Sequence, residues 1–205
     1  MTNTLMVDCY RRDAAWRLAF YRSMIRPHSD CVTVNAGSLG PGFDASGYHA
    51  VVFSGSQIML GEEDPEPGLA GFVRSLRVPA MGICFGHQLF ARSFGARVLS
   101  GKTIERFETV RLERPGPLFD GLGATVSVLE SHREFVDPES IRQVGWRVYG
   151  QSDSCPVEAM HHPELPLFGL QCHPERSGET GRRIFANFYN NAVLPFLAGR
   201  LQYQR

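Results

Sequence analysis

The segment from Ala80 to Gln88 restricts the fold of this chain more than any other. It reads AMGICFGHQ: an apolar run typical of a buried strand, then Cys84, then residues with helical spacing. Glycines stand two residues before and two residues after the cysteine, at Gly82 and Gly86. A sharp turn from a strand into a helix needs such small neighbours, and it projects the side chain at its apex away from the backbone. We therefore predict a nucleophile elbow with Cys84 as the reactive residue.

A buried structural thiol is the alternative for any single cysteine, because free cysteine is among the most buried residue types. The expected place of Cys84 at a helix N-terminus favours the reactive interpretation, since the helix dipole stabilises a thiolate. The chain has five cysteines, an odd number, and none of them forms a CxxC pair. This pattern argues against a disulfide framework and against a structural zinc site, and it fits a reducing compartment.

Elsewhere, short apolar runs alternate with helical stretches, the pattern of an α/β fold with a largely parallel sheet. We expect strands at residues 5–8, 31–34, 50–53 and 78–83, and helices at residues 12–24, 68–76, 85–94 and 180–197, the last interrupted near Pro195. Six further strand candidates, at residues 96–99, 108–112, 124–129, 146–149, 156–160 and 167–171, predict antiparallel additions to the sheet edge. The prediction is a single domain over residues 1–205: a three-layer open, mostly parallel sheet flanked by helices, with a flavodoxin-like core.

Charge and hydropathy exclude several classes of function. Basic and acidic residues balance at 21 each, and the arginines are scattered, so no basic patch for nucleic acid or an anionic membrane is expected. No apolar run approaches the roughly 20 residues of a membrane-spanning helix. The N-terminal residues lack the apolar core of a signal peptide. We therefore expect a cytoplasmic protein.

Two motifs together resemble the class I glutamine amidotransferases. GICFGHQ, around Cys84, is similar to the family signature G-x-C-x-G-x-Q, and GLQCHPE, at residues 169–175, is similar to G-x-Q-x-H-P-E. The resemblance implies a catalytic triad of Cys84, His173 and Glu175. The chemistry agrees: a thiol with a pKa of about 8.5 needs a base to take its proton, and the base needs an acceptor that orients it. In an extended segment His173 and Glu175 would point to the same side, and Cys172 would face the core.

The resemblance also implies supporting residues. The oxyanion hole would use the Phe85 N–H and a second backbone N–H from Gly55 or Ser56, where Ser54-Gly55-Ser56-Gln57 stands in place of the family's S-G-G-P. Gln88, one helical turn after the nucleophile, would hold the substrate glutamine. Ser131 and His132 belong to a segment that resembles the stand-alone glutaminase of two-chain GMP synthases, and we expect them to contact substrate.

A glutaminase follows from this resemblance: glutamine is hydrolysed to glutamate and ammonia through a γ-glutamyl thioester, without a metal or an organic cofactor. Neither S-G-G-x-D-S nor G-x-x-x-x-G-K-[ST] is present, so the ammonia would pass to a separate synthetase chain, as in GMP synthase. The acceptor stays open, because Arg176-Ser177-Gly178 instead resembles the glutaminase of imidazole glycerol phosphate synthase. The neighbouring histidines 161 and 162 lack a third ligand at suitable spacing, so we predict no metal site.

Three alternatives remain. The same triad could serve a γ-glutamyl hydrolase or peptidase that acts on γ-glutamyl conjugates without a synthetase partner. A second alternative is a partner-dependent glutaminase in a specialised pathway. A third, from a different class, is a non-catalytic domain that binds a partner or a metabolite.

Overall fold

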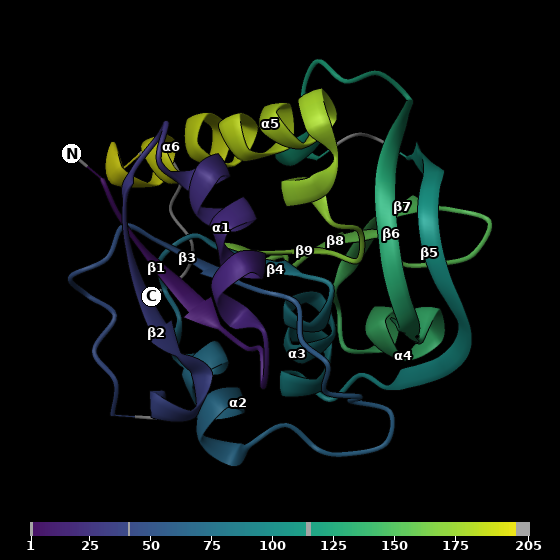
Figure 1. Cartoon of the computed structure of the whole chain (residues 1–205), viewed down its shortest axis with the longest axis horizontal. Coiled ribbons are helices and arrows are strands. Elements are labelled where there is room, and N and C mark those ends of the chain that lie inside the picture. Colours follow the sequence, from purple (N-terminus) through teal and green to yellow (C-terminus); the bar gives the residue numbers. More distant parts are fainter. Residues whose placement is uncertain (1, 41, 114–115, 200–205) are drawn as a thin grey trace.

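A computed structural model describes residues 2–40, 42–113 and 116–199. In these ranges the strands form one nine-stranded sheet with the order β2-β1-β3-β4-β9-β8-β7-β5-β6 (Figure 1). The pairs from β2 across to β9 are parallel, and those from β9 across to β6 are antiparallel. The strands are β1 (Asn3–Asp8), β2 (Asp30–Asn35), β3 (Ala50–Phe53), β4 (Ala80–Ile83), β5 (Val98–Leu112), β6 (Thr125–Val136), β7 (Arg147–Gln151), β8 (Ala159–His161) and β9 (Leu167–Leu170).

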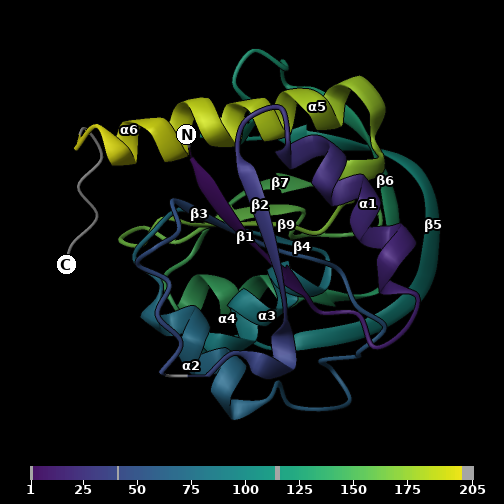
Figure 2. The same cartoon turned by 60° about the vertical axis from the view of Figure 1, so that its left-hand side comes forward.

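Helices cover both faces of the sheet, so the molecule has three layers. In Figures 1 and 2, α1, α5 and α6 lie on one face, and α2, α3 and α4 lie on the other. The helices are α1 (Ala14–Ile25), α2 (Pro67–Ser75), α3 (Phe85–Ser93), α4 (Pro138–Gln143), α5 (Gly178–Asn187) and α6 (Leu194–Leu197). None of the helices in the described ranges is long and apolar enough to cross a membrane.

The hydrophobic core is divided by the sheet, because successive side chains of a strand point to opposite faces. In β1, Met6 packs in the core beneath α1 and α5, whereas Leu5 and Val7 pack in the core beneath α2 and α3. Cys172 is buried in the first of these cores, as predicted. The arrangement confirms the expected α/β fold, and the four strands added beyond β9 make its sheet mixed.

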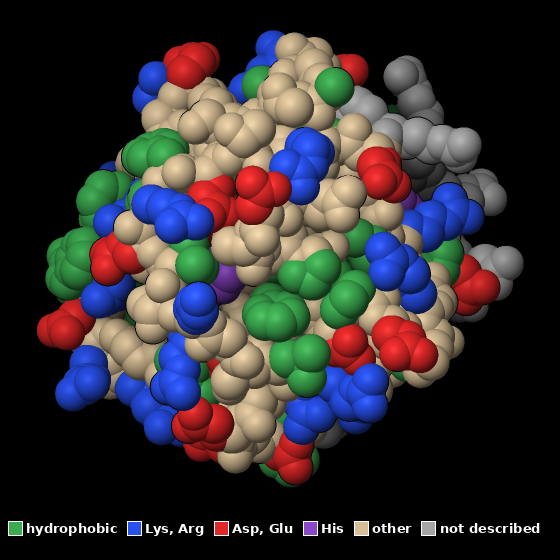
Figure 3. Space-filling view, turned by 90° about the vertical axis from the view of Figure 1, so that its right-hand side faces the viewer, with side chains coloured by type: hydrophobic (Ala, Val, Ile, Leu, Met, Phe, Trp, Pro, Cys, Tyr) green, Lys and Arg blue, Asp and Glu red, His purple; other side chains and the backbone are tan. Residues whose placement is uncertain are grey.

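Two strands of the second half, β5 and β6, are longer than the sequence suggests. The segments expected at residues 96–99 and 108–112 belong to one strand, β5, and the segment expected at residues 124–129 extends to Val136 in β6. The polar residues between the expected segments suggest turns. In the structure they lie on the exposed side of the long hairpin that β5 and β6 form at the edge of the sheet. Figure 3 shows the face to which this hairpin belongs, where basic and acidic side chains are mixed, as the balanced composition implies.

Two helical details also differ from the prediction. Helix α4 is not among the predicted helices, although Asp137 caps it by accepting hydrogen bonds from the N–H groups of Glu139 and Ser140. The interruption expected near Pro195 takes the form of a π-helical segment, Phe188–Val193, between α5 and α6. Pro195 then lies in the first turn of α6, directly after the π-helical segment.

Candidate active site

Cys84 occupies a tight turn between β4 and α3. Its backbone has φ 52° and ψ −102°, a region that residues with side chains rarely adopt and that persists where the surroundings enforce it. A Cβ on Gly82 would lie 2.5 Å from the carbonyl carbon of Gly86, and a Cβ on Gly86 would lie 2.7 Å from Cβ of Phe53. Both glycines are therefore required by space, and the predicted elbow is present.

His173 and Glu175 follow β9, the strand that pairs with β4. His173 Nδ1 lies 2.7 Å from Glu175 Oε1. The extended conformation predicted for this segment is wrong: Pro174–Arg176 forms a turn of 3-10 helix, which brings the carboxylate back to the ring. The backbone is anchored on both sides, because His173 N–H donates to the Leu129 carbonyl at 2.8 Å and the Ser177 hydroxyl donates to the His173 carbonyl at 2.7 Å.

The environment of His173 favours its protonated form. Burial lowers the pKa of the imidazole, but the negative charges of Glu175 and of a Cys84 thiolate raise it more, so the pKa lies well above its usual value. Since Nδ1 is committed to Glu175, Nε2 is the nitrogen that can exchange a proton with the thiol. A histidine placed in this way can exchange a proton with a neighbouring thiol, as the base of a cysteine nucleophile does.

The three side chains line one cavity of about 200 Å³. It is smaller than the roughly 300–1,000 Å³ of pockets for drug-sized ligands, so it suits a ligand the size of an amino acid. Its walls come from the triad, from the loop after β1, from α1 and from the loop after β3. The other lining residues are Tyr10, Trp16, Arg17, Phe20, Ser56, Gln57, Ser131 and Arg176.

The contribution of α1 was missed, because no motif marks it. The general rule that sites in parallel sheets form at the carboxyl ends of the strands is the one signal that could have revealed it. β1 lies beside β3 in the sheet, so the segment after β1 reaches the same edge as the loop after β3.

The predicted oxyanion donors differ in availability. Phe85 contributes the first N–H of α3, directly after Cys84. The Gly55 N–H donates to the Tyr21 hydroxyl at 3.0 Å, so it is occupied. Ser56 lines the cavity, and its N–H makes no hydrogen bond to another residue in the described ranges. Of the two residues expected in this loop, Ser56 thus has the available donor.

One of the three predicted substrate-contacting residues, Ser131, lies in the cavity wall. Its carbonyl accepts a long hydrogen bond from Cys84 Sγ at 3.8 Å. Gln88 is buried instead, and its amide donates to a backbone carbonyl of β6 at 2.9 Å and to Gln171 Oε1 at 3.1 Å. His132 is also buried, and neither it nor Gln88 belongs to the cavity lining.

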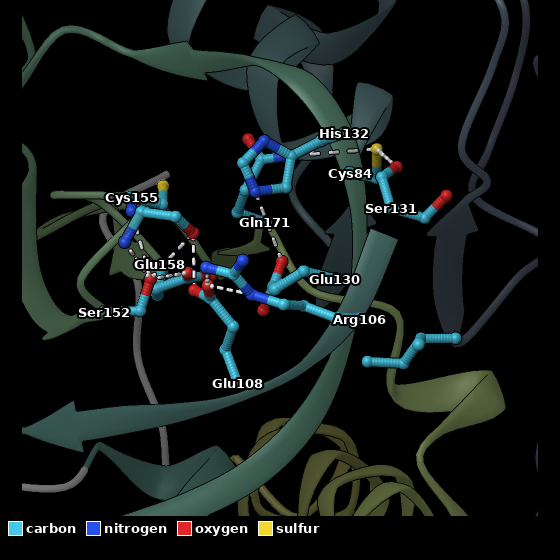
Figure 4. Close-up of polar contacts among 12 residues, drawn as sticks. Cys84, Arg106, Glu108, Glu130, Ser131, His132, Ser152, Cys155, Glu158 and Gln171 are labelled. Atoms are coloured by element: carbon cyan, nitrogen blue, oxygen red, sulfur yellow. Dashed lines mark hydrogen bonds and ion pairs between the residues drawn. The ribbon is translucent and has the colours of Figure 1, made fainter. Parts of the chain in front are cut away.

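Behind the nucleophile lies a buried acidic cluster that the sequence did not indicate (Figure 4). Glu130 and Glu158 are 0% and 1% exposed. Burial, with the charge of Glu158, raises the pKa of Glu130 to about 10, and burial raises the pKa of Glu158 to about 7. At neutral pH Glu130 therefore keeps its proton, and Glu158 accepts a hydrogen bond from the Ser152 hydroxyl at 2.7 Å.

The same cluster is where the described residues could hold a metal. Donor atoms of His132, Cys155 and Glu158 lie within 4.8 Å of one another, and His132 Nε2 is 3.5 Å from the Glu130 carboxylate. Nitrogen, sulfur and oxygen ligands of this kind suit zinc. Burial holds Glu130 in its neutral form, which is a poor metal ligand, and the absence of a metal site stays a prediction.

Comparison with known proteins gives a family match. The sequence profile of the family described as glutamine amidotransferase class-I matches residues 24–192. Among curated proteins, a glutamine-hydrolysing GMP synthase subunit of Pyrococcus furiosus is 38% identical over 141 residues, which are 67% of this chain and 72% of that protein. The protein of the same name from Methanothermobacter thermautotrophicus is 36% identical over 124 residues, or 58% of this chain and 63% of that protein.

Solved structures share the fold. A protein of Thermoplasma acidophilum, provisionally assigned to GMP synthase as one of its subunits, superposes with a TM-score of 0.82 at 23% identity and covers 98% of both chains. A glutamine amidotransferase of Thermotoga maritima superposes with a TM-score of 0.70 at 19% identity, covering 93% of this chain and 83% of that one.

Proposed function

This chain belongs to the class I glutamine amidotransferases, and we propose that it hydrolyses glutamine with Cys84, His173 and Glu175 as its catalytic triad. The observation that carries the proposal is the convergence of these three side chains in one cavity, although they come from two distant segments of the chain. The raised pKa of His173 and the turn at Cys84 support the same assignment.

In the first half of the reaction the Cys84 thiolate attacks the side-chain carbonyl carbon of glutamine. The negative charge that develops on the carbonyl oxygen is stabilised by the N–H groups of Phe85 and Ser56. The tetrahedral intermediate then collapses. His173 gives its Nε2 proton to the departing nitrogen, ammonia leaves, and a γ-glutamyl thioester remains on Cys84.

In the second half His173, now neutral, takes a proton from a water molecule as that water attacks the thioester. Collapse of this second intermediate breaks the carbon–sulfur bond and releases glutamate. The Cys84 thiolate and the His173 imidazolium are restored. Glu175 keeps Nδ1 protonated throughout, so that Nε2 is always the nitrogen that faces the reacting atoms.

The ammonia is passed to a separate synthetase chain. Support comes from the curated relatives, whose name describes one part of a glutamine-hydrolysing GMP synthase that is built from more than one polypeptide. A GMP synthase-like partner is therefore the first to test.

Glutamate release from glutamine, with and without the synthetase chain encoded by the same genome, tests this function. The wild-type chain should release glutamate, and Cys84→Ala should lose at least about 10³-fold in rate. Cys31→Ala is the matched control, because that thiol lies on β2, outside the cavity lining. Glutaminase activity that survives in Cys84→Ala would refute the triad.

A γ-glutamyl hydrolase is the second candidate, and one observation favours it. Trp16 and Phe20 line the cavity and yet are 52% and 41% exposed, so they offer apolar surface for an amine larger than ammonia. A higher kcat/KM for γ-glutamyl anilides than for glutamine, without any synthetase, would support this candidate. A preference for glutamine would exclude it.

A further inference from the structure

Arg17 is the least explained side chain of the catalytic cavity. It projects from α1 and lines the cavity together with Cys84 and His173. Its guanidinium carbon lies 4.6 Å from the centre of the Trp16 ring and 5.4 Å from the centre of the Tyr10 ring. Cation–π contacts of this kind hold a guanidinium in place without neutralising its charge.

This guanidinium has no anionic partner among the described residues. Its Nε is buried and makes no hydrogen bond, and Arg17 forms no ion pair with a carboxylate of the described chain. Glu175 is the carboxylate that lines the same cavity, but its Oε1 is bound to His173. The Arg17 side chain is half-buried, and its Nε is the buried donor. A buried donor is costly when it is left unpaired, so the geometry is that of a site whose anion arrives with the ligand.

We propose that Arg17 binds a carboxylate of the substrate and thereby orients the scissile amide against Cys84. This inference rests on the proposed function, because it assigns a role in the same cavity. Arginine suits the task, since its planar fork donates two parallel hydrogen bonds to a carboxylate. The carboxylate has two chemical sources: the α-carboxylate of the glutamyl group, or a carboxylate on the amine that leaves.

Arg176 is the competing residue, because its side chain also lines the cavity. Arg17 is favoured by its fixed position between two aromatic rings and by its buried, unpartnered Nε. Arg26, at the end of the same helix, is exposed and lies outside the cavity lining. Arg26→Gln is therefore a control that makes the same change of charge on the same helix.

The first test needs no turnover. Iodoacetate and iodoacetamide alkylate the same thiol, but only iodoacetate carries a carboxylate. The labelling rate at Cys84, followed by peptide mass spectrometry, should show a preference for iodoacetate over iodoacetamide in the wild-type chain. Arg17→Gln should reduce this preference about 10- to 100-fold, whereas Arg26→Gln should leave it unchanged. An unchanged preference in Arg17→Gln, or a loss seen only in Arg176→Gln, would overturn the assignment.

The second test separates the two sources of the carboxylate. kcat/KM is measured, with the synthetase partner present, for glutamine and for 4-aminobutanamide, which lacks the α-carboxylate. It is also measured for γ-glutamylglycine and for γ-glutamylmethylamide, which differ in a carboxylate on the leaving amine. In one of these two pairs, the Arg17→Gln variant should no longer prefer the substrate that carries the extra carboxylate. Its KM for that substrate should rise more than its kcat falls. Discrimination that persists in both pairs would refute the proposal, while the activity of Arg17→Gln relative to Cys84→Ala would still report on the triad.

Discussion

At the scale of single residues, the candidate site depends on a backbone conformation that its neighbours enforce. Cys84 has a positive φ, and the chain passes so close to itself here that neither Gly82 nor Gly86 has room for a side chain. The carboxylate of Glu175 both orients the ring of His173 and raises its pKa. Two substitutions test these two features separately.

Gly82→Ala should destabilise the protein by about 2–3 kcal/mol, because the added methyl group would meet backbone atoms of Gly86 at 2.5 Å. Urea unfolding measures the change. Gly47→Ala is the control, since a Cβ at that position would meet no atom within 4 Å. Equal stability of the two variants would contradict the packing described for the elbow.

Glu175→Gln should lower the pKa of His173, because it removes a negative charge that raises this pKa. The rate of glutamate release should fall by about 10²-fold or more, because the base is less well oriented and holds its proton less firmly. The sign for stability follows from linkage. Because the pKa of His173 is higher in the folded state than its unfolded value of 6.5, protonation of His173 stabilises the fold fully below pH 6.5. This stabilisation is lost as the pH rises through the folded pKa. Glu175→Gln should therefore cost more stability at pH 6 than at high pH. The same loss at both pH values would argue against the ion pair.

At the scale of secondary-structure elements, α1 matters more to the site than its sequence indicates. It supplies Trp16, Arg17 and Phe20 to the cavity wall, and through Tyr21 it supports the loop after β3.

The elements that carry the two motifs could be predicted, because the glycines around Cys84 and the string from His173 to Glu175 mark these turns in the local sequence. The role of α1 could not, since it depends on which strands are neighbours in the sheet. The long β5–β6 hairpin was divided in the prediction for a related reason: its exposed polar residues resemble turns until the partner strand is known.

Tyr21→Phe tests the link between α1 and the loop. It leaves the buried Gly55 N–H without its hydrogen-bond acceptor, which should cost about 1–3 kcal/mol of stability and lower glutaminase activity several-fold. Thermal unfolding and glutamate release measure the two effects. Tyr48→Phe is a suitable control, because the Tyr48 hydroxyl has no hydrogen bond to the described part of the chain. If both variants behave like the wild type, the loop does not depend on this contact.

At the scale of the whole molecule, the pair of Glu130 and Glu158 makes global stability depend on pH. Both carboxyl groups have pKa values raised by burial, to about 10 and about 7. A raised carboxyl pKa means that the unfolded chain loses protons that the folded chain keeps, so stability falls as the pH rises above about 4.5.

Glu130→Gln should remove much of this dependence, because an amide of the same shape does not ionise. The variant should be more stable than the wild type at pH 8, by about 1–3 kcal/mol, and close to it at pH 5. Urea unfolding at the two pH values decides the matter. A gain that is equal at both would show that the carboxyl pair does not titrate as described.

The position of β9 has a consequence for the order in which the protein becomes active during synthesis. Within the described residues β9 is the last strand in sequence, but it lies in the middle of the sheet, between β4 and β8. Cys84, at the end of β4, is therefore made long before the strand that precedes His173, the base we propose, can take its place. Until then β4 and β8 lack their shared neighbour, and the Cys84 thiol has no imidazole to take its proton. A nascent chain should thus carry an unreactive cysteine until residues beyond Glu175 have emerged from the ribosome, so that catalysis begins only once the sheet is closed.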